Sequence, residues 1–445
     1  MKKFLFALIL LFAPAAHAIP VNEITTPGGL SVWRVEDKTT PALTISFAFR
    51  GGTELDPREK QGETALLASM LTQGAGNYSS SAFSQALAEE NIALSFSAGR
   101  DAITGDLHFL LSHTDKAIEL SKLALTDAHF SDADLNRQKA GLMALFSRSM
   151  NDPDWRATRL LFQNVYGGTP YAQSSRGTPA SLPVISPDDL HNLLAARLVK
   201  SRLVIVAVGD ASPAEVARIT DAIFGALPQG DPVPDLDINL QHVGQTWFNS
   251  DTAAPQAVVQ FALPGLAPTD SDYPAYLVLN DIVGGGGFRS RLMKELRQKL
   301  GATYGIYTSP LPLKRAPILY GQGTVAQNQM ESALQLIRAA IAKGADGVVS
   351  DDELKASKTY LAGAFTRDLT SSGAIADFVL SARLAGLPAD YYDHYADAIL
   401  KVSADDLKRV GQRLFNPGQL RFAIVAPTAP QQVDKTVADL WAVAP

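Results

Sequence analysis

Short apolar runs alternate along the chain with segments in which apolar residues recur every three or four positions. The first pattern predicts strands and the second predicts amphipathic helices. We expect, in order, strands 30–35 and 42–49, helices 63–71 and 81–90, strands 92–97 and 102–111, and helix 114–125. The first two strands read as a hairpin-like pair. Because strands come in adjacent groups with helices between the groups, the pattern predicts an α+β fold with a mainly antiparallel sheet.

Several features of this pattern occur twice in the same order, at separations of 214 to 219 residues. They are the capping-box residues Ser131 and Ser350, the capping-box residues Ser186 and Ser403, the apolar strands 203–208 and 420–425, and the segments 47–51 and 261–265. Chance similarity of generic helix caps would not preserve both the order and the spacing. The repetition therefore predicts two tandem homologous domains.

A hinge between the two predicted domains lies where proline and glycine accumulate. Pro228, Gly230, Pro232 and Pro234 fall close together, and such a stretch sustains neither a helix nor an inner strand. We therefore expect an N-terminal domain over residues 19–228, a linker over residues 229–245 and a C-terminal domain over residues 246–445.

Residues 1–18 have the pattern of a secretory signal peptide. Lys2 and Lys3 precede an unbroken apolar run, and Ala16 and Ala18 offer a small-x-small cleavage site. The alternative is an uncleaved anchor, but the apolar run is well short of the roughly 20 residues that span a bilayer. We expect cleavage after Ala18, export to the periplasm and no membrane span in the mature chain.

The composition of the chain excludes several classes of protein and several kinds of catalytic site. The 445 residues include 39 basic and 45 acidic side chains, and a net charge of −6 argues against a dedicated nucleic-acid-binding protein. The chain has no Cys, which excludes disulfides, thiol nucleophiles and thiolate metal sites. The serines at 79–81 lack a nearby His base. No G-x-S-x-G or G-K-[S/T] motif is present, and the glycines at 284–287 lack the later acidic residue of a dinucleotide site.

The seven His residues do not form a helical zinc motif. Such a motif places two imidazoles on one helix face, together with a carboxylate base. The closest pair, His108 and His113, straddles the end of a predicted strand and the start of a predicted helix. The sequence therefore offers no zinc site of the H-x-x-E-H kind.

Residues 284–304 carry the most specific signal in the chain. They read, in order, a Gly-rich turn, Ser-Arg-Leu, a helix, Leu-Arg-x-x-x-Gly and a Tyr. This segment resembles the second-domain signature of the pitrilysin, insulinase and processing-peptidase family of zinc peptidases, the inverzincins. The resemblance implies two similar α+β domains that form half of a clam-shell chamber. It also implies that Arg297 fixes the substrate backbone and that the phenol of Tyr304 donates to the oxyanion of the scissile carbonyl.

The catalytic motif of that family is degenerate in this chain. Where active members carry H-x-x-E-H, Ala65 and Ser69 replace the two His and Ala68 replaces the Glu. Ungapped counting places the third ligand at Leu145 or a neighbour. Ala and Leu cannot coordinate zinc, so the resemblance implies that this chain holds no zinc and no other cofactor.

An intact Arg/Tyr pair beside a lost metal motif resembles the non-catalytic subunit of paired family members. We therefore expect a zinc-free subunit of a heterodimeric periplasmic peptidase. Its partner chain would carry H-x-x-E-H and the zinc, and unfolded peptide would be the substrate. One alternative is a stand-alone peptide-binding or chaperone-like protein that has lost hydrolysis. Another is a structural scaffold that resembles the core subunits of respiratory complexes, which export and the retained pair disfavour.

Overall fold

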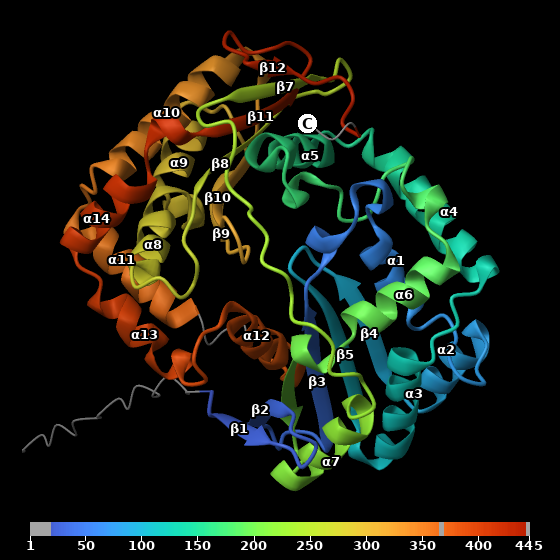
Figure 1. The fold of residues 1–445 in the computed structure, drawn as a ribbon. Helices are drawn as coiled ribbons and strands as arrows, with labels where there is room; N and C mark the ends of the chain where they lie inside the picture. The colour runs from blue at the N-terminus through green and yellow to red at the C-terminus, as the bar shows by residue number, and fades with distance from the viewer. Residues whose placement is uncertain (1–18, 365–368, 442–445) are drawn as a thin grey trace, which may run out of the picture.

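Two six-stranded sheets, one from each half of the sequence, organise the fold (Figure 1). The computed structural model describes residues 19–364 and 369–441, so the predicted signal peptide lies outside the described residues. The strand orders are β1-β2-β6-β3-β5-β4 and β12-β7-β11-β8-β10-β9. The strands are β1 (Val21–Thr25), β2 (Ser31–Glu36), β3 (Ala42–Arg50), β4 (Ala93–Ala98), β5 (Ala102–Leu110), β6 (Leu203–Gly209), β7 (Thr246–Ser250), β8 (Ala257–Pro264), β9 (Ile306–Leu311), β10 (Ile318–Val325), β11 (Arg421–Ala426) and β12 (Lys435–Thr436).

The same five-strand arrangement occurs in both sheets. β2 runs parallel to β6, and β7 runs parallel to β11 at the matching place. The remaining neighbours among these five strands are antiparallel in both sheets. The predicted α+β class with two similar, mainly antiparallel units is confirmed.

One detail of the strand prediction is wrong. Residues 30–35 and 42–49 largely form β2 and β3, but these strands are not paired as a hairpin, because β6 lies between them. Ile205 of β6 is in register with Val32 on one side and with Phe47 on the other. β6 is apolar along almost its whole length and buried, and a central place in the sheet lets both of its faces be covered.

The helices of each half mostly cover one face of that half's own sheet, and their N-termini follow the predicted caps. Ser186 and Ser403 form complete capping boxes with Asp189 and Asp406. In the described part of the chain, no helix has both the length and the apolar character needed to cross a membrane. The α-helices are α1 (Glu63–Met70), α2 (Ser80–Glu89), α3 (Thr114–Thr126), α4 (Asp132–Ser149), α5 (Pro153–Tyr166), α6 (Pro187–Arg197), α7 (Pro213–Phe224), α8 (Tyr273–Asn280), α9 (Arg291–Met293), α10 (Met330–Ala345), α11 (Asp351–Ala364), α12 (Ser372–Ala385), α13 (Tyr391–Lys401) and α14 (Ala404–Leu414).

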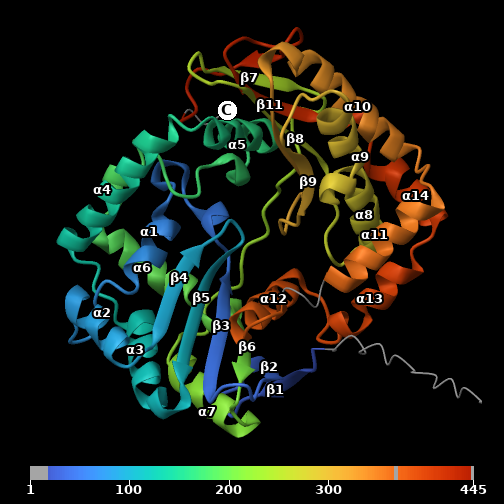
Figure 2. The same ribbon diagram turned by 180° about the vertical axis from the view of Figure 1, so that it is seen from behind.

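Each half of the sequence places one helix on the sheet of the other half. α5, from the first half, packs on β7, β8 and β11, and Asn164 donates to the carbonyl of Phe422 at 3.0 Å. α12, from the second half, packs on β3 and β6, where Ala376 and Val379 join the cluster that contains Val206. Figure 2 shows α12 beside β3 and β6 and α5 near β7 and β11. This exchange buries apolar surface between the halves and so joins them.

The connection between the two halves runs along both of them. Residues 228–245 contain no helix or strand. Arg202 donates to the carbonyl of Asp231 at 2.8 Å, and the amide of Gln241 donates to the carbonyl of Val165 at 2.7 Å. The first bond attaches the connection to the residue that directly precedes β6, and the second attaches it to α5.

Candidate functional site

The helix that matches the family's metal motif is α1. Gly62 starts it with a positive φ of 89°, and a side chain there would collide with the backbone of Gly177. Ala65, Ala68 and Ser69 share one face of α1 because they are three and four positions apart. Ala68 is buried, and the hydroxyl of Ser69 donates to the carbonyl of Leu66 at 2.9 Å. This face presents the methyl groups of Ala65 and Ala68 and a Ser69 hydroxyl that already forms a hydrogen bond. These groups are not the nitrogen, sulfur or carboxylate ligands that zinc requires.

The third ligand position falls on α4, which contacts α1. Leu145 is 36% exposed, whereas Leu135 and Phe146 of the same helix point into the core. The sequence has no Asp or Glu between Asp134 and Asp152, so no register of α4 brings a carboxylate to this position. The described residues contain no cluster of three or more His, Cys, Asp or Glu side chains that could hold a metal ion.

Two buried carboxyl groups, those of Asp56 and Glu54, lie in the segment that leads into α1. Asp56 accepts hydrogen bonds from the amide of Gly62 at 3.0 Å and from the hydroxyl of Thr64. Burial nevertheless raises the pKa of Asp56 to about 7. These contacts give Asp56 the role of fixing the start of α1.

Glu54, in the segment that leads into α1, faces the other half of the molecule. It is 3% exposed, and one carboxylate oxygen accepts from the amide of Gly52 at 3.0 Å. The other oxygen lies 3.7 Å from Arg315, which precedes β10, and accepts no hydrogen bond from the described residues. Burial, with the nearby charge of Asp101, raises the pKa of Glu54 to about 7. No local pattern in the chain predicts this contact between the halves.

The Gly-rich turn of the second half is compact because it packs against β9. Side chains at Gly284 and Gly285 would collide with Thr308 of β9 and with Asn280 of α8. Thr308 and Asn280 hydrogen-bond each other at 2.6 Å. Because these glycines have no side chains, the turn packs close to the sheet. The chain then continues into α9 and a π-helix, η9 (Lys294–Lys299).

Arg297 lies on η9 with its guanidinium 4.6 Å above the ring of Phe288. Phe288 is 62% exposed, so this stacked pair is at the surface. Within the described residues, the Arg297 guanidinium has no hydrogen bond or ion pair. A cation held on an aromatic face keeps its N–H groups available for a ligand.

Tyr304 is 80% exposed, and its hydroxyl has no hydrogen-bond partner among the described residues. It lies in the turn that precedes β9, which begins at Ile306. Thr303 fixes this turn, because its hydroxyl donates to the carbonyl of Gly305 at 2.9 Å and accepts from the Gly305 amide at 3.0 Å. Gly301, with φ of 66°, reverses the chain between the helix and the turn. Arg297 and Tyr304 thus lie on one surface segment without touching each other.

The structure does not bring the two candidate regions together. α1 belongs to the half built on the first sheet, and α9 and η9 belong to the half built on the second sheet (Figures 1 and 2). The arrangement can supply hydrogen-bond donors but no metal-bound nucleophile.

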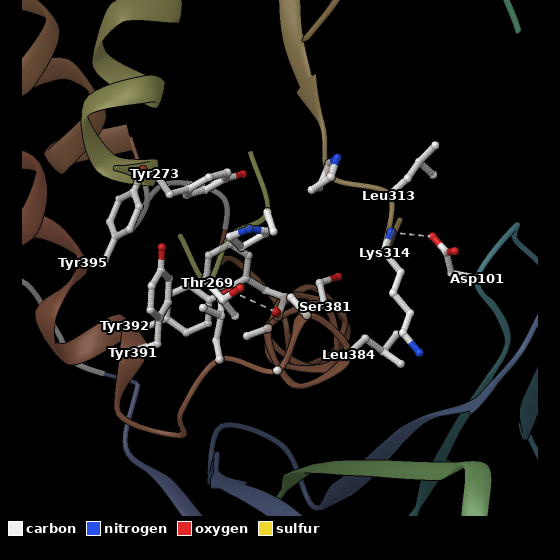
Figure 3. Close-up of a pocket in the computed structure, with 18 of the residues that line it drawn as sticks. Asp101, Thr269, Tyr273, Leu313, Lys314, Ser381, Leu384, Tyr391, Tyr392 and Tyr395 are labelled. Carbon is white, nitrogen blue, oxygen red and sulfur yellow. Dashed lines mark hydrogen bonds between the residues drawn. The ribbon is translucent and has the colours of Figure 1, made fainter. Parts of the chain in front are cut away.

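A separate cavity of about 830 Å³ lies between the halves. Tyr273, Tyr391, Tyr392 and Tyr395 line one part of it, and Lys314 lies on another side (Figure 3). The sequence pattern gave no reason to group these residues, since they come from α8, α13 and the turn before β10.

Two family models match the chain in succession. The one described as "Insulinase (Peptidase family M16)" matches residues 32–179, and the one described as "Peptidase M16 inactive domain" matches residues 185–361. A Helicobacter pylori protein named "Non-peptidase homolog YmxG" is 26% identical over 442 residues, covering 96% of this chain and 99% of its own length.

Solved structures have the same fold over nearly the whole chain. The peptidase M16 inactive domain from Pseudomonas fluorescens has a TM-score of 0.87 at 24% identity and covers 93% of this chain and 100% of its own. A protease from Helicobacter pylori has a TM-score of 0.79 at 17% identity and covers 92% and 100%. With both domain models matched in order and the signature of residues 284–304 in place, this chain belongs to peptidase family M16, as a member without the H-x-x-E-H motif.

Proposed function

We propose that this chain is the zinc-free subunit of a heterodimeric periplasmic zinc peptidase. In this proposal it supplies Arg297 and Tyr304 to the zinc site of a partner chain that carries H-x-x-E-H. The single observation that carries it is a pair of donors, an exposed Tyr304 and a half-buried Arg297, that have no hydrogen-bond partner among the described residues, in a chain whose own motif helix has no metal ligand.

The exposure of Tyr304 supports a role outside this chain. A tyrosine ring at 80% exposure contributes little to the stability of its own fold, since it buries little apolar surface. Its hydroxyl is ready to donate to a negatively charged oxygen, and such a preformed donor stabilises the developing charge of acyl transfer by about 2–4 kcal/mol. A partner's zinc site would provide that oxygen.

The stacking of Arg297 on Phe288 supports a binding role for the guanidinium. The ring restricts the long side chain without using its N–H donors. A guanidinium can donate two parallel hydrogen bonds to a carboxylate and single bonds to peptide carbonyls. In the proposed complex it would fix the backbone of the bound peptide.

The sheet edges offer a way to hold an extended peptide. β4 ends the first sheet beside α1, and β9 ends the second sheet directly after Tyr304. Within the described residues neither strand has a neighbour on its outer side. A peptide can add as a strand to such an edge, which places it near Tyr304 in the case of β9.

The second candidate function is a stand-alone peptide-binding or chaperone-like protein. It is favoured by the same open edges and by the cavity between the halves, because neither needs a metal. The two candidates differ in whether a second chain is required for peptide cleavage.

Co-expression with exported H-x-x-E-H chains of the same organism tests the proposal. We expect one of them to co-purify with this chain and the complex to cleave unfolded peptides. In that complex, Tyr304→Phe should lower turnover by roughly 10²–10³-fold and leave assembly intact. Tyr307→Phe, at another exposed tyrosine on β9, is the matched control and should leave turnover within about twofold.

Unchanged turnover in the Tyr304→Phe complex would remove Tyr304 from the mechanism. If no H-x-x-E-H chain co-purifies and the isolated chain binds unfolded peptides without cleaving them, the stand-alone function replaces the heterodimer.

A further inference from the structure

The cavity between the halves combines elements that are distant in sequence. Its walls come from the end of β3, the start of β5, α8, α12, α13 and the turn before β10. Its volume of about 830 Å³ is in the range of cavities that hold small organic ligands. It contains neither the α1 motif positions nor the Arg297–Tyr304 segment, so it is a separate site.

One part of the cavity is aromatic and uncharged. Phe378 of α12 stacks on Tyr392 of α13 with ring centroids 4.1 Å apart, and Tyr391 packs edge-on against Tyr392 at 5.1 Å. Burial raises the pKa of Tyr391 and that of Tyr273, so these phenols stay neutral. Leu277 and other leucines complete this part. Such a wall binds an apolar or aromatic group.

The other part of the cavity is cationic. Arg50, at the end of β3, donates to the carbonyls of Leu384 at 2.8 Å and Arg383 at 3.0 Å, at the end of α12. These are neutral acceptors, and within the described residues Arg50 has no ion pair. The ammonium of Lys314 has neither a hydrogen bond nor an ion pair there. Figure 3 shows its side chain extending from the turn toward Leu384.

Asp101, the one acidic residue among the described residues of the lining, forms no ion pair with Arg50 or Lys314. The carboxylate of Asp101 accepts from the backbone amide of Lys314 at 3.0 Å and from the hydroxyl of Tyr171. Burial is the main cause that lowers the pKa of Lys314, and repulsion from Arg315 and Arg50 adds to it, whereas the carboxyl groups of Glu54 and Asp101 oppose it. An anionic ligand group beside Arg50 and Lys314 would relieve this repulsion.

We propose that this cavity binds a small amphiphilic carboxylate. Its apolar body would lie among the tyrosines and its carboxylate between Arg50 and Lys314. The C-terminus of a short apolar peptide and a free fatty acid both have this chemistry. A primary amine in the place of the carboxylate is disfavoured, because it would add a third positive charge. The proposal does not depend on the zinc chemistry of a partner chain.

Isothermal titration of the chain without residues 1–18 tests this proposal with two pairs of probes. One pair is octanoate and octanamide, and the other is acetyl-Leu-Leu-Phe as its free acid and as its C-terminal amide. We expect saturable binding at one site per chain, with each acid at least tenfold tighter than its amide. Tighter binding of the peptide acid than of octanoate identifies the peptide C-terminus as the source, and the reverse order identifies a fatty acid.

Two variants link binding to this cavity. Lys314→Glu should weaken the acids at least tenfold, whereas Lys122→Glu, at an exposed lysine on α3 outside the lining, should not change their affinity. Ser381→Trp, at a position that is exposed to the cavity, should fill it and abolish binding of both acids. Circular dichroism checks the fold of each variant. Equal affinity for acids and amides, no saturable binding, or unchanged affinity in Lys314→Glu would overturn the proposal.

Discussion

The buried carboxyl group of Glu54 makes a specific contribution to the pH dependence of stability. Its pKa is raised from 4.5 to about 7 in the folded protein, chiefly by burial. A carboxyl group with a raised pKa binds its proton more tightly in the folded state than in the unfolded state. Its contribution to stability is therefore fully present below pH 4.5 and is lost as the pH rises through 7.

The size of this contribution follows from the two pKa values. One pKa unit corresponds to about 1.4 kcal/mol, so the complete effect is roughly 3 kcal/mol. Between pH 5 and pH 8 the loss is about 2.5 kcal/mol, because some of the titration lies below pH 5. Other carboxyl groups also titrate in this range, including Asp56, so the total pH dependence does not isolate Glu54.

The difference in the free energy of unfolding between wild type and Glu54→Gln isolates the contribution of the Glu54 carboxyl group. Gln keeps an acceptor for the amide of Gly52 and does not ionise. We expect the free energy of unfolding of wild type, measured by urea denaturation and taken relative to Glu54→Gln, to fall by on the order of 2 kcal/mol from pH 5 to pH 8. Glu59→Gln, at an exposed position in the same segment, is the control and should show no such change. A wild-type curve that runs parallel to the Glu54→Gln curve across this range would refute the reasoning.

The remaining predictions concern backbone packing and metal content. Gly209 ends β6 where a side chain would overlap the carbonyl of Ala42, so Gly209→Ala should lower the free energy of unfolding by about 1–3 kcal/mol in urea denaturation. Gly99→Ala, where an added methyl group meets its nearest neighbour at 3.4 Å, is the control and should cost less than about 1 kcal/mol. Elemental analysis of the purified chain should find no stoichiometric zinc, because neither α1 nor α4 presents a ligand at the family positions. Equal destabilisation by the two alanine substitutions would contradict the steric argument, and about one tightly held zinc per chain would contradict the metal argument.

Local signals in the sequence were sufficient to predict the repeated elements and to identify the family. The serines that begin α6 and α14 form capping boxes because a cap needs only residues within one turn of each other. Strands β6 and β11 are inner strands because β6 is apolar throughout and β11 is apolar after its first residue, Arg421. The loss of the metal motif at Ala65, Ala68 and Ser69 needs only the sequence, since the side chains at these positions cannot bind zinc.

Tertiary structure decided the contacts that join distant segments. Sequence order suggested β2 paired with β3, but β6 lies between them because a strand that is apolar on both faces is best covered at the centre of a sheet. An apolar helix face does not specify which sheet it will cover, so the exchange of α5 and α12 between the halves was not predictable. The turn position of Tyr304 depends on where β9 begins, and strand ends are set by pairing with β10.

Sequence alone thus determined the α+β class, most of the elements of the first half, the duplication and the loss of the H-x-x-E-H motif, because caps, periodicity and side-chain chemistry act over a few residues. The structure decided the contact of Glu54 with Arg315 and the meeting of Arg50, Lys314 and the tyrosines around one cavity. These arrangements depend on how two sheets and their exchanged helices pack together, and packing of that kind minimises exposed apolar surface over the whole chain at once.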